Sequence, residues 1–211
     1  MLDKKSLVLP CATVFISSFC VMVIELVAGR IIARFLGSSL YTWTSIIGVV
    51  LAGITIGNYV GGRLADRFKP VKTLAILFAL CAVACLVIIG LNTLIGNWTW
   101  LWNLNWPARI LLHVTVVFLL PSAFLGTISP VVAKMALEKG LPTGHTIGDV
   151  YACGAAGSIA GTFATGYYLI ALMGTISIIC SVAAVMVVMA VLYSAGYKIL
   201  NPDFSNVPND R

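Results

Sequence analysis

Charged residues are the scarcest component of this sequence. Asp, Glu, Lys and Arg together make up only 9% of its 211 residues. A soluble domain of ordinary composition carries about 25% charged residues, because its surface must be hydrated. Hydrophobic residues account for 60% of this chain, and its mean hydropathy is +1.04. The composition excludes an ordinary soluble domain and predicts a protein whose outer surface contacts the lipid bilayer.

The sequence also lacks the polar–apolar alternation, over about ten residues at a time, that is typical of membrane barrel strands. Its apolar runs are about 20 residues or longer, which is the length that crosses a ~30 Å hydrocarbon core as a helix. In lipid every backbone N–H and C=O group must be paired within the protein, and a helix does this within one segment. The predicted fold class is therefore all-α, an integral membrane six-helix bundle.

Residue combinations that support catalysis or metal binding are also missing. No nucleophile–base pair and no cluster of metal ligands appears in the sequence, so we expect no catalytic residue, no metal, no cofactor and no enzyme activity. The cysteines all fall within apolar segments and are interpreted as small buried hydrophobes. They are Cys11, Cys20, Cys81, Cys85, Cys153 and Cys180.

Six membrane spans are predicted, which together form one transmembrane domain over residues 7–197. Their expected bounds are Leu7–Ile31, Tyr41–Leu64, Val71–Ile95, Pro107–Leu137, Ile147–Leu172 and Thr175–Tyr197. The flanking segments 1–6 and 198–211 are expected to be a cytoplasmic N-terminus and a cytoplasmic tail.

The distribution of Lys and Arg indicates an orientation. If the N-terminus is inside, ten basic residues lie in inner segments and three in outer segments, which are Arg30, Arg34 and Arg109. Because basic residues accumulate on the cytoplasmic side, we expect both termini to be cytoplasmic, in a bacterial inner membrane. The net charge of +6 is explained by this flanking, and we expect no nucleic-acid partner.

Tryptophans gather in the outer segment between the third and fourth predicted spans, at Trp98, Trp100, Trp102 and Trp106. Indole rings favour the headgroup layer, because the ring is apolar and its N–H needs a partner. The segment is therefore expected to lie along the outer interface. A stacking site for a ligand is the alternative.

Glycines recur every four residues in the second span, at Gly53, Gly57 and Gly61. The fifth span has a similar repeat of glycines at Gly154, Gly157 and Gly161. A helix face without side chains lets another backbone approach closely, which is how helices pack in membranes. These faces are predicted either to pack within the bundle or to form a sliding or dimerising interface.

Glu25 is the strongest functional candidate, because an acidic group in hydrocarbon is costly unless it is paired or protonated. It is expected either to form a fixed pair with Arg30 or with a basic group on another helix, or to serve as a cation or proton site facing a central cavity.

Four further candidates are less specific. His113 is either a hydrogen-bonded bundle residue or a proton relay, and Asp149 either a helix cap or a ligand. Asn58 and Tyr59 either line a cavity or hydrogen-bond across helices.

Several segments resemble a known family. Residues Gly62 to Arg67, with the sequence Gly-Arg-Leu-Ala-Asp-Arg, closely resemble the loop motif between helices two and three of the major facilitator superfamily. The wider pattern is similar to the membrane domain of fused major-facilitator/spermidine synthase proteins. It comprises Glu25–Arg30, Leu36–Ser39, Gly53–Arg67, Leu120–Pro130 and Gly148–Ile170. The resemblance implies a gating role for Gly62, Asp66 and Arg67.

The chain also departs from that family. The loop motif continues with Lys69 and Pro70 in place of Gly and Arg, and Gly154 stands where the family often has Asn. The basic residue often found in the middle of helix four is missing. No Gly-rich nucleotide loop follows Lys198, so the synthase activity is not carried over.

The resemblance implies one six-helix half of a two-part transporter. A homodimer would supply the second half, and a small, possibly polyamine-related cation is the expected solute. The alternative is a non-transporting membrane subunit that anchors a separate, soluble aminopropyltransferase-like partner.

Overall fold

The structure is a computed structural model that describes residues 5–138 and 142–200, and the described chain forms an all-helical bundle without strands. Six runs are long and apolar enough to cross a membrane. They are α1 (Lys5–Leu36), α2 (Leu40–Arg67), α3 (Pro70–Gly96), α4 (Trp106–Leu137), the continuous run of α5 (Thr143–Phe163), η2 (Ala164–Leu169) and α6 (Ile170–Leu172), and α7 (Thr175–Leu200). The prediction of six membrane-spanning helices is confirmed; the expected tail from Asn201 to Arg211 lies outside the described residues.

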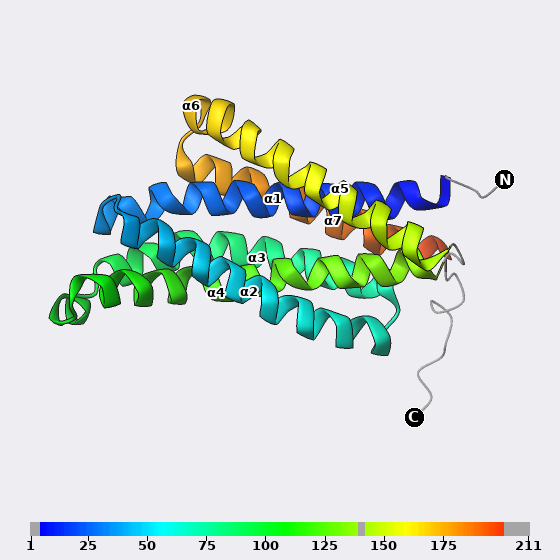
Figure 1. Ribbon diagram of the computed structural model, residues 1–211, viewed down its shortest axis with the longest axis horizontal. Coiled ribbons are helices and arrows are strands. Elements are labelled where there is room, and N and C mark those ends of the chain that lie inside the picture. The colour runs from blue at the N-terminus through cyan, green and yellow to red at the C-terminus, as the bar shows by residue number, and fades with distance from the viewer. Residues whose placement is uncertain (1–4, 139–141, 201–211) are drawn as a thin grey trace.

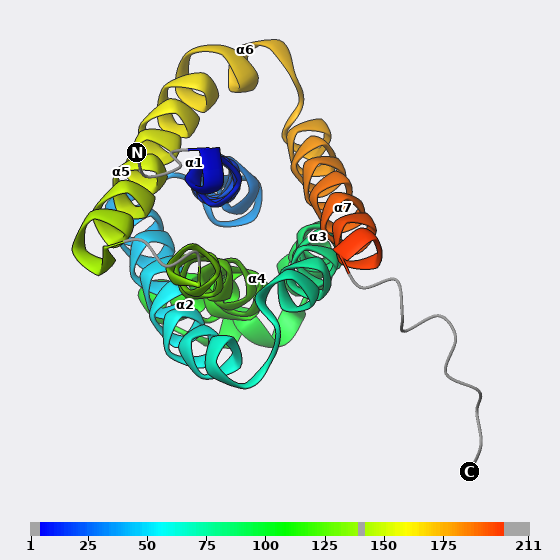
Figure 2. The ribbon, with the colours of Figure 1, turned by 90° about the vertical axis from the view of Figure 1, so that its right-hand side faces the viewer.

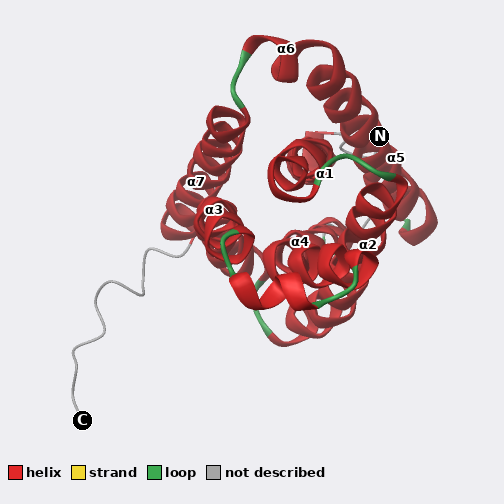
Figure 3. Cartoon of the chain, turned by 90° about the vertical axis from the view of Figure 1, so that its left-hand side faces the viewer, coloured by secondary structure: helices red, strands yellow, loops and turns green. Residues whose placement is uncertain are grey.

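Helix ends follow local sequence signals, and short loops join successive spans (Figure 3). α1 ends at Gly37, whose φ of 72° is favourable only for a residue without a side chain. Ser39 then caps α2 by accepting a hydrogen bond from the Thr42 amide at 3.2 Å. Asn105 caps α4 in the same way, through Ala108 at 3.2 Å.

The helices pack in a repeated pattern. The most extensive contacts join α2 to α4, α1 to α5 and α3 to α7. In each of the first two pairs the helices run in the same direction. Gly57 and Gly61 of α2 meet Ala123 and Thr127 of α4, and Gly157 and Gly161 of α5 meet Phe15 and Phe19 of α1. The second span thus packs on the fourth as the fifth packs on the first. α1 lies inside a ring of the other helices (Figures 1 and 2).

The two glycine faces make these close contacts possible. A Cβ atom at Gly57 would overlap the carbonyl oxygen of Ala123 in α4, and one at Gly61 would lie 2.7 Å from that of Thr127. A Cβ at Gly157 would overlap the carbonyl oxygen of Phe15 in α1. Both faces are therefore covered by helices of the same chain. The expectation that they form a sliding or dimerising interface between chains is wrong, because no bare glycine surface is left for a second copy.

The repeat of glycines is not equally tight throughout. Gly53 and Gly161 are also closed in by neighbouring atoms, at 2.6 Å in each case. At Gly154 the nearest atoms belong to Ser18 and Val14, at 3.3 and 3.4 Å, so a methyl group here requires a shift of only a few tenths of an ångström.

The cysteines differ in burial. Cys20, Cys81 and Cys85 are buried, but Cys180 is exposed and so departs from the interpretation of buried hydrophobes.

We predict that Gly57→Ala and Gly157→Ala each destabilise the bundle by about 1–3 kcal/mol, because the added methyl forces two backbones apart. Gly62→Ala and Gly148→Ala are the matched controls, since a Cβ at either position meets nothing within 4 Å. Thermal denaturation of the purified protein in detergent measures the difference. Equal melting temperatures for Gly57→Ala and Gly62→Ala would contradict the packing described above.

Candidate functional site

Glu25 lies about two-thirds of the way along α1 and is half-buried. No acid–base pair in the described chain includes it, so the expected pair with Arg30 does not form. The physical reason is helical geometry: five residues at 3.6 per turn place the two side chains about 140° apart around the helix. Glu25 and Arg30 therefore point to different sides of α1.

The neighbours of Glu25 follow from the helix contacts. The α1 backbone meets α5 at Phe15 and Phe19, through Gly157 and Gly161, and Trp43 of α2 covers Gly29 farther along. Glu25 thus lies between the part of α1 that α5 covers and the part that α2 covers. The parallel register of α1 and α5, continued onward, puts Glu25 level with the π-helical segment η2. Such π-helical turns occur frequently at functional sites.

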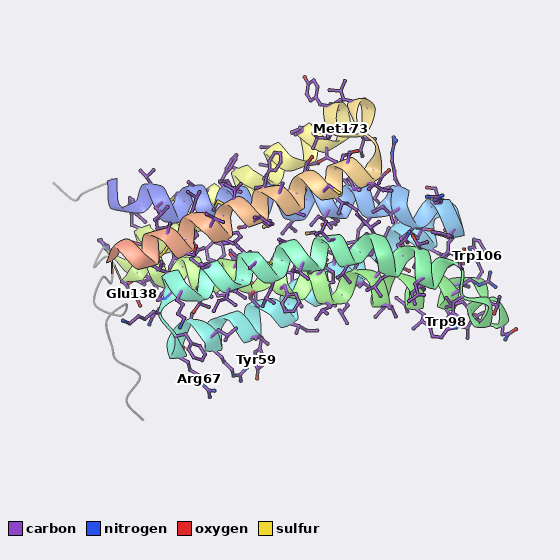
Figure 4. The ribbon with its side chains drawn as sticks, turned by 180° about the vertical axis from the view of Figure 1, so that it is seen from behind. Tyr59, Arg67, Trp98, Trp106, Glu138 and Met173 are labelled. Carbon is purple, nitrogen blue, oxygen red and sulfur yellow. The ribbon has the colours of Figure 1, made fainter. Side chains whose placement is uncertain are left out.

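Asn58 and Tyr59 do not take either of their expected positions. Both are exposed on the outside of α2, and Tyr59 points away from the bundle (Figure 4). Arg63, one turn along the same helix, donates a hydrogen bond to the Tyr59 hydroxyl, and its guanidinium carbon lies 3.5 Å from the ring centroid. The expectation of a cavity-lining or cross-helix role is therefore wrong for Tyr59, because its bond stays within one helix.

Two carboxylates, at the end of the bundle where α2 ends and α5 begins, have basic partners. Asp149 Oδ2 lies 3.0 Å from His145 Nδ1 in the previous turn. α5 begins at Thr143, six residues earlier, so the expectation that Asp149 caps this helix is wrong. Asp66, from the segment that resembles the major-facilitator motif, lies 3.6 Å from Lys134 Nζ at the end of α4. This pair ties the two helices together next to Gly61.

His113 is buried inside the bundle with a single polar partner. Its Nε2 lies 3.0 Å from Oδ1 of Asn92, a residue of α3 that the sequence reasoning missed. Because an amide oxygen only accepts, Nε2 carries the proton in this contact. The pair joins α3 to α4. The signal that could have revealed Asn92 is an amide side chain within an otherwise apolar span.

A polar pocket of about 250 Å³ opens beside Asn92, between α1, α3 and the start of α7. Arg30 and Arg34 of α1 line one side, and Thr175 and Ser177 of α7 line another. Two of the candidates taken from the sequence, Arg30 and His113, are therefore brought into one neighbourhood through Asn92. The other four, Glu25, Asn58, Tyr59 and Asp149, are not part of it.

Arg109, the third basic residue at this end of the bundle, has a structural role. It is buried, and its guanidinium donates hydrogen bonds to the carbonyl oxygens of Leu101, at 3.0 Å, and Leu104, at 3.2 Å. These bonds hold the short helix η1 (Thr99–Asn103) against the start of α4. The side chains of Trp98 and Trp106 are exposed beside it, at the far end of the molecule (Figure 4).

Comparison with protein-family models, with curated proteins and with solved structures gives no match to this chain.

Proposed function

We propose that this chain is one half of a membrane transporter, in which two six-helix bodies pack side by side through the outward faces of α2 and α5. The observation that carries the proposal is that two spans are widely exposed and yet are the least apolar of the six. The most apolar stretches of α2 and α7 are equally buried, a third of each, but the mean hydropathy of α2 is only 1.6, whereas that of α7 is 2.7. The fifth span is both the least buried, at 17%, and the least hydropathic, at 1.2.

Lipid does not suit such surfaces. An outward polar group in hydrocarbon has no hydrogen-bond partner, whereas interfaces between membrane helices are enriched in small and polar residues. On the outward face of α2, Asn58 has no hydrogen-bond partner among the described residues, whereas Thr55 donates to the Leu51 carbonyl oxygen at 2.8 Å. The outward face of α5 includes Ala152, Ala155 and Ala156. Asn58 lies about 14 Å along the helix from Arg67, at a depth where the bilayer offers no water. A second protein body would provide the contacts that lipid lacks.

The arrangement of the helices supports a transporter half. The pairs α2–α4 and α5–α1 are equivalent if the first three spans correspond, in the same order, to the last three, with the opposite direction across the membrane. Transporters built from such repeats place their solute site at the interface of two bodies near the middle of the membrane. The resemblance to major-facilitator proteins leads to the same expectation, with a second copy of the chain as the other body.

Glu25 is the residue we propose for solute or proton binding. Along α1 it lies between the stretch that packs on α5 and the stretch that Trp43 of α2 covers, and no ion pair in the described chain neutralises it. A carboxylate in this position favours a small cation, and polyamine-related cations are the class to test first. In this proposal the end that carries Arg63, Arg67 and Lys134 faces the cytoplasm of a bacterium.

We expect cysteine cross-linking to join two copies through α2 and α5. Thr55 lies about 18 Å along α2 from Arg67, and Ala155 lies about 18 Å along α5 from Thr143. The two positions are thus at the same height in the bundle, and both side chains are exposed. In a background without the native cysteines, copies with Thr55→Cys should cross-link to copies with Ala155→Cys in membranes. Ala79→Cys, which is exposed on α3, is the control. Thr55→Cys and Ala155→Cys copies should each cross-link poorly to Ala79→Cys copies. Equal yields for these two control pairings and for the Thr55–Ala155 pairing would contradict the proposed interface.

We predict that Glu25→Gln lowers the uptake of spermidine or a similar cation into proteoliposomes by at least about tenfold, since the substitution removes the negative charge that holds the solute. Glu138→Gln is the matched control, because Glu138 is exposed at the end of α4. Cation uptake that is unaffected by Glu25→Gln would exclude this role. The absence of any uptake together with capture of a soluble synthase-like partner would favour the membrane-subunit alternative.

A further inference from the structure

Two arginines line the pocket between α1, α3 and α7. Arg30 and Arg34 lie one turn apart on α1 and both line it, whereas none of the described residues that line it is acidic. Neither guanidinium forms an ion pair within the described chain. Two adjacent cations without a counter-charge, at the end of a membrane span, favour an anion at this position.

The start of α7 adds hydrogen-bond donors to the same pocket. Gly174, Thr175 and Ser177 line it, and the first intrahelical bond runs from the amide of Ile178 to the Gly174 carbonyl, at 3.1 Å. The preceding amides of the first turn have no partner within the helix. Together with the positive end of the helix dipole, such amides bind phosphate and carboxylate groups.

A buried amide supplies an independent observation. Asn92 is only 6% exposed, and its oxygen is held by His113. Its side-chain nitrogen has no partner among the described residues, and no fully buried polar side-chain atom in that part of the chain lacks one. The nitrogen therefore keeps some exposure, and Asn92 lines the pocket. An exposed amide donor on a lining residue is suited to an anionic oxygen.

A separate apolar groove of about 400 Å³ lies farther along α1 and α7, toward the middle of the bundle. Its lining includes Phe19 and Val23 of α1 and Val182 and Val185 of α7, and it shares no described residue with the lining of the pocket. Val23 lies two helical turns from Arg30 on the same side of α1. α1 contacts α7 much less extensively than it contacts α5, and α6 and the start of α7 are set apart from α1 in the ribbon view (Figure 2).

We propose that this composite site binds one anionic phospholipid, with its phosphate between Arg30, Arg34 and the start of α7 and one acyl chain in the α1–α7 groove. The charge of the pocket selects the phosphate. The apolar groove on the same helix pair favours a lipid over a free phosphate ion, which would use the pocket alone. A bound lipid also fills the space between α1 and α7, where the chain leaves its own packing open.

Native mass spectrometry of the protein, purified in mild detergent from membranes that contain phosphatidylglycerol, tests the proposal. We expect one retained phosphatidylglycerol per chain, and we expect the double variant Arg30→Gln/Arg34→Gln to lower the retained fraction by at least about tenfold. Arg63→Gln/Arg67→Gln is the matched control, because these arginines are also exposed and four residues apart, at the opposite end of the bundle. Equal retention by the two double variants would overturn the proposal.

A second pair of variants tests the acyl-chain groove. Val185→Trp places a large ring in the groove and should lower lipid retention, whereas Val188→Trp, on an exposed position of the same helix outside the groove lining, should not. Titration with inorganic phosphate at constant ionic strength separates the two sources of the anion. Thermal stabilisation by phosphate that depends on Arg30 and Arg34, without any retained lipid, would assign the site to a free anion and overturn the lipid proposal.

Discussion

The bundle depends on backbone-to-backbone contact at two places, where glycines of α2 meet α4 and glycines of α5 meet α1. Lipid gives helices no hydrophobic reason to associate, so close van der Waals contact has to supply the attraction. Gly57 and Gly157 provide it by leaving room for the carbonyl oxygens of Ala123 and Phe15. A side chain at either position would separate the paired helices.

This close packing has consequences for the outer surface of the protein. Because the glycine faces of α2 and α5 point inward, the opposite faces of these helices are exposed, and they carry residues such as Thr55, Asn58 and Ala155. The most apolar helices, α3 and α7, pack on each other with apolar residues outward, as lipid requires. The proposed function assigns the side of α3 and α7 to lipid and the side of α2 and α5 to a second protein body.

The sequence was sufficient for the spans but not for the side-chain partners. Long apolar runs predict six helices, and signals such as Gly37 and Ser39 mark where one span ends and the next begins. The glycine repeats predict close packing, yet they do not say which helix fills each face, since that depends on tertiary arrangement. The pair Glu25–Arg30 fails on helix geometry. Asn92 was missed because its role appears only where His113 meets it.

The pocket of Arg30 and Arg34 was also beyond the sequence. Basic residues at the end of a span are ordinarily interpreted as interface anchors. What distinguishes these two is the arrival of the α7 N-terminus beside them, 140 residues farther along the chain, and this comes from the contact between α3 and α7.

The central claim is that one chain is half of a functional unit. Counting the copies of the chain in lipid nanodiscs, by stepwise photobleaching of a single dye per chain, tests it most directly. The account predicts two bleaching steps in most particles, at protein-to-disc ratios where chance co-occupancy is rare. One step per particle under conditions that support activity would contradict it.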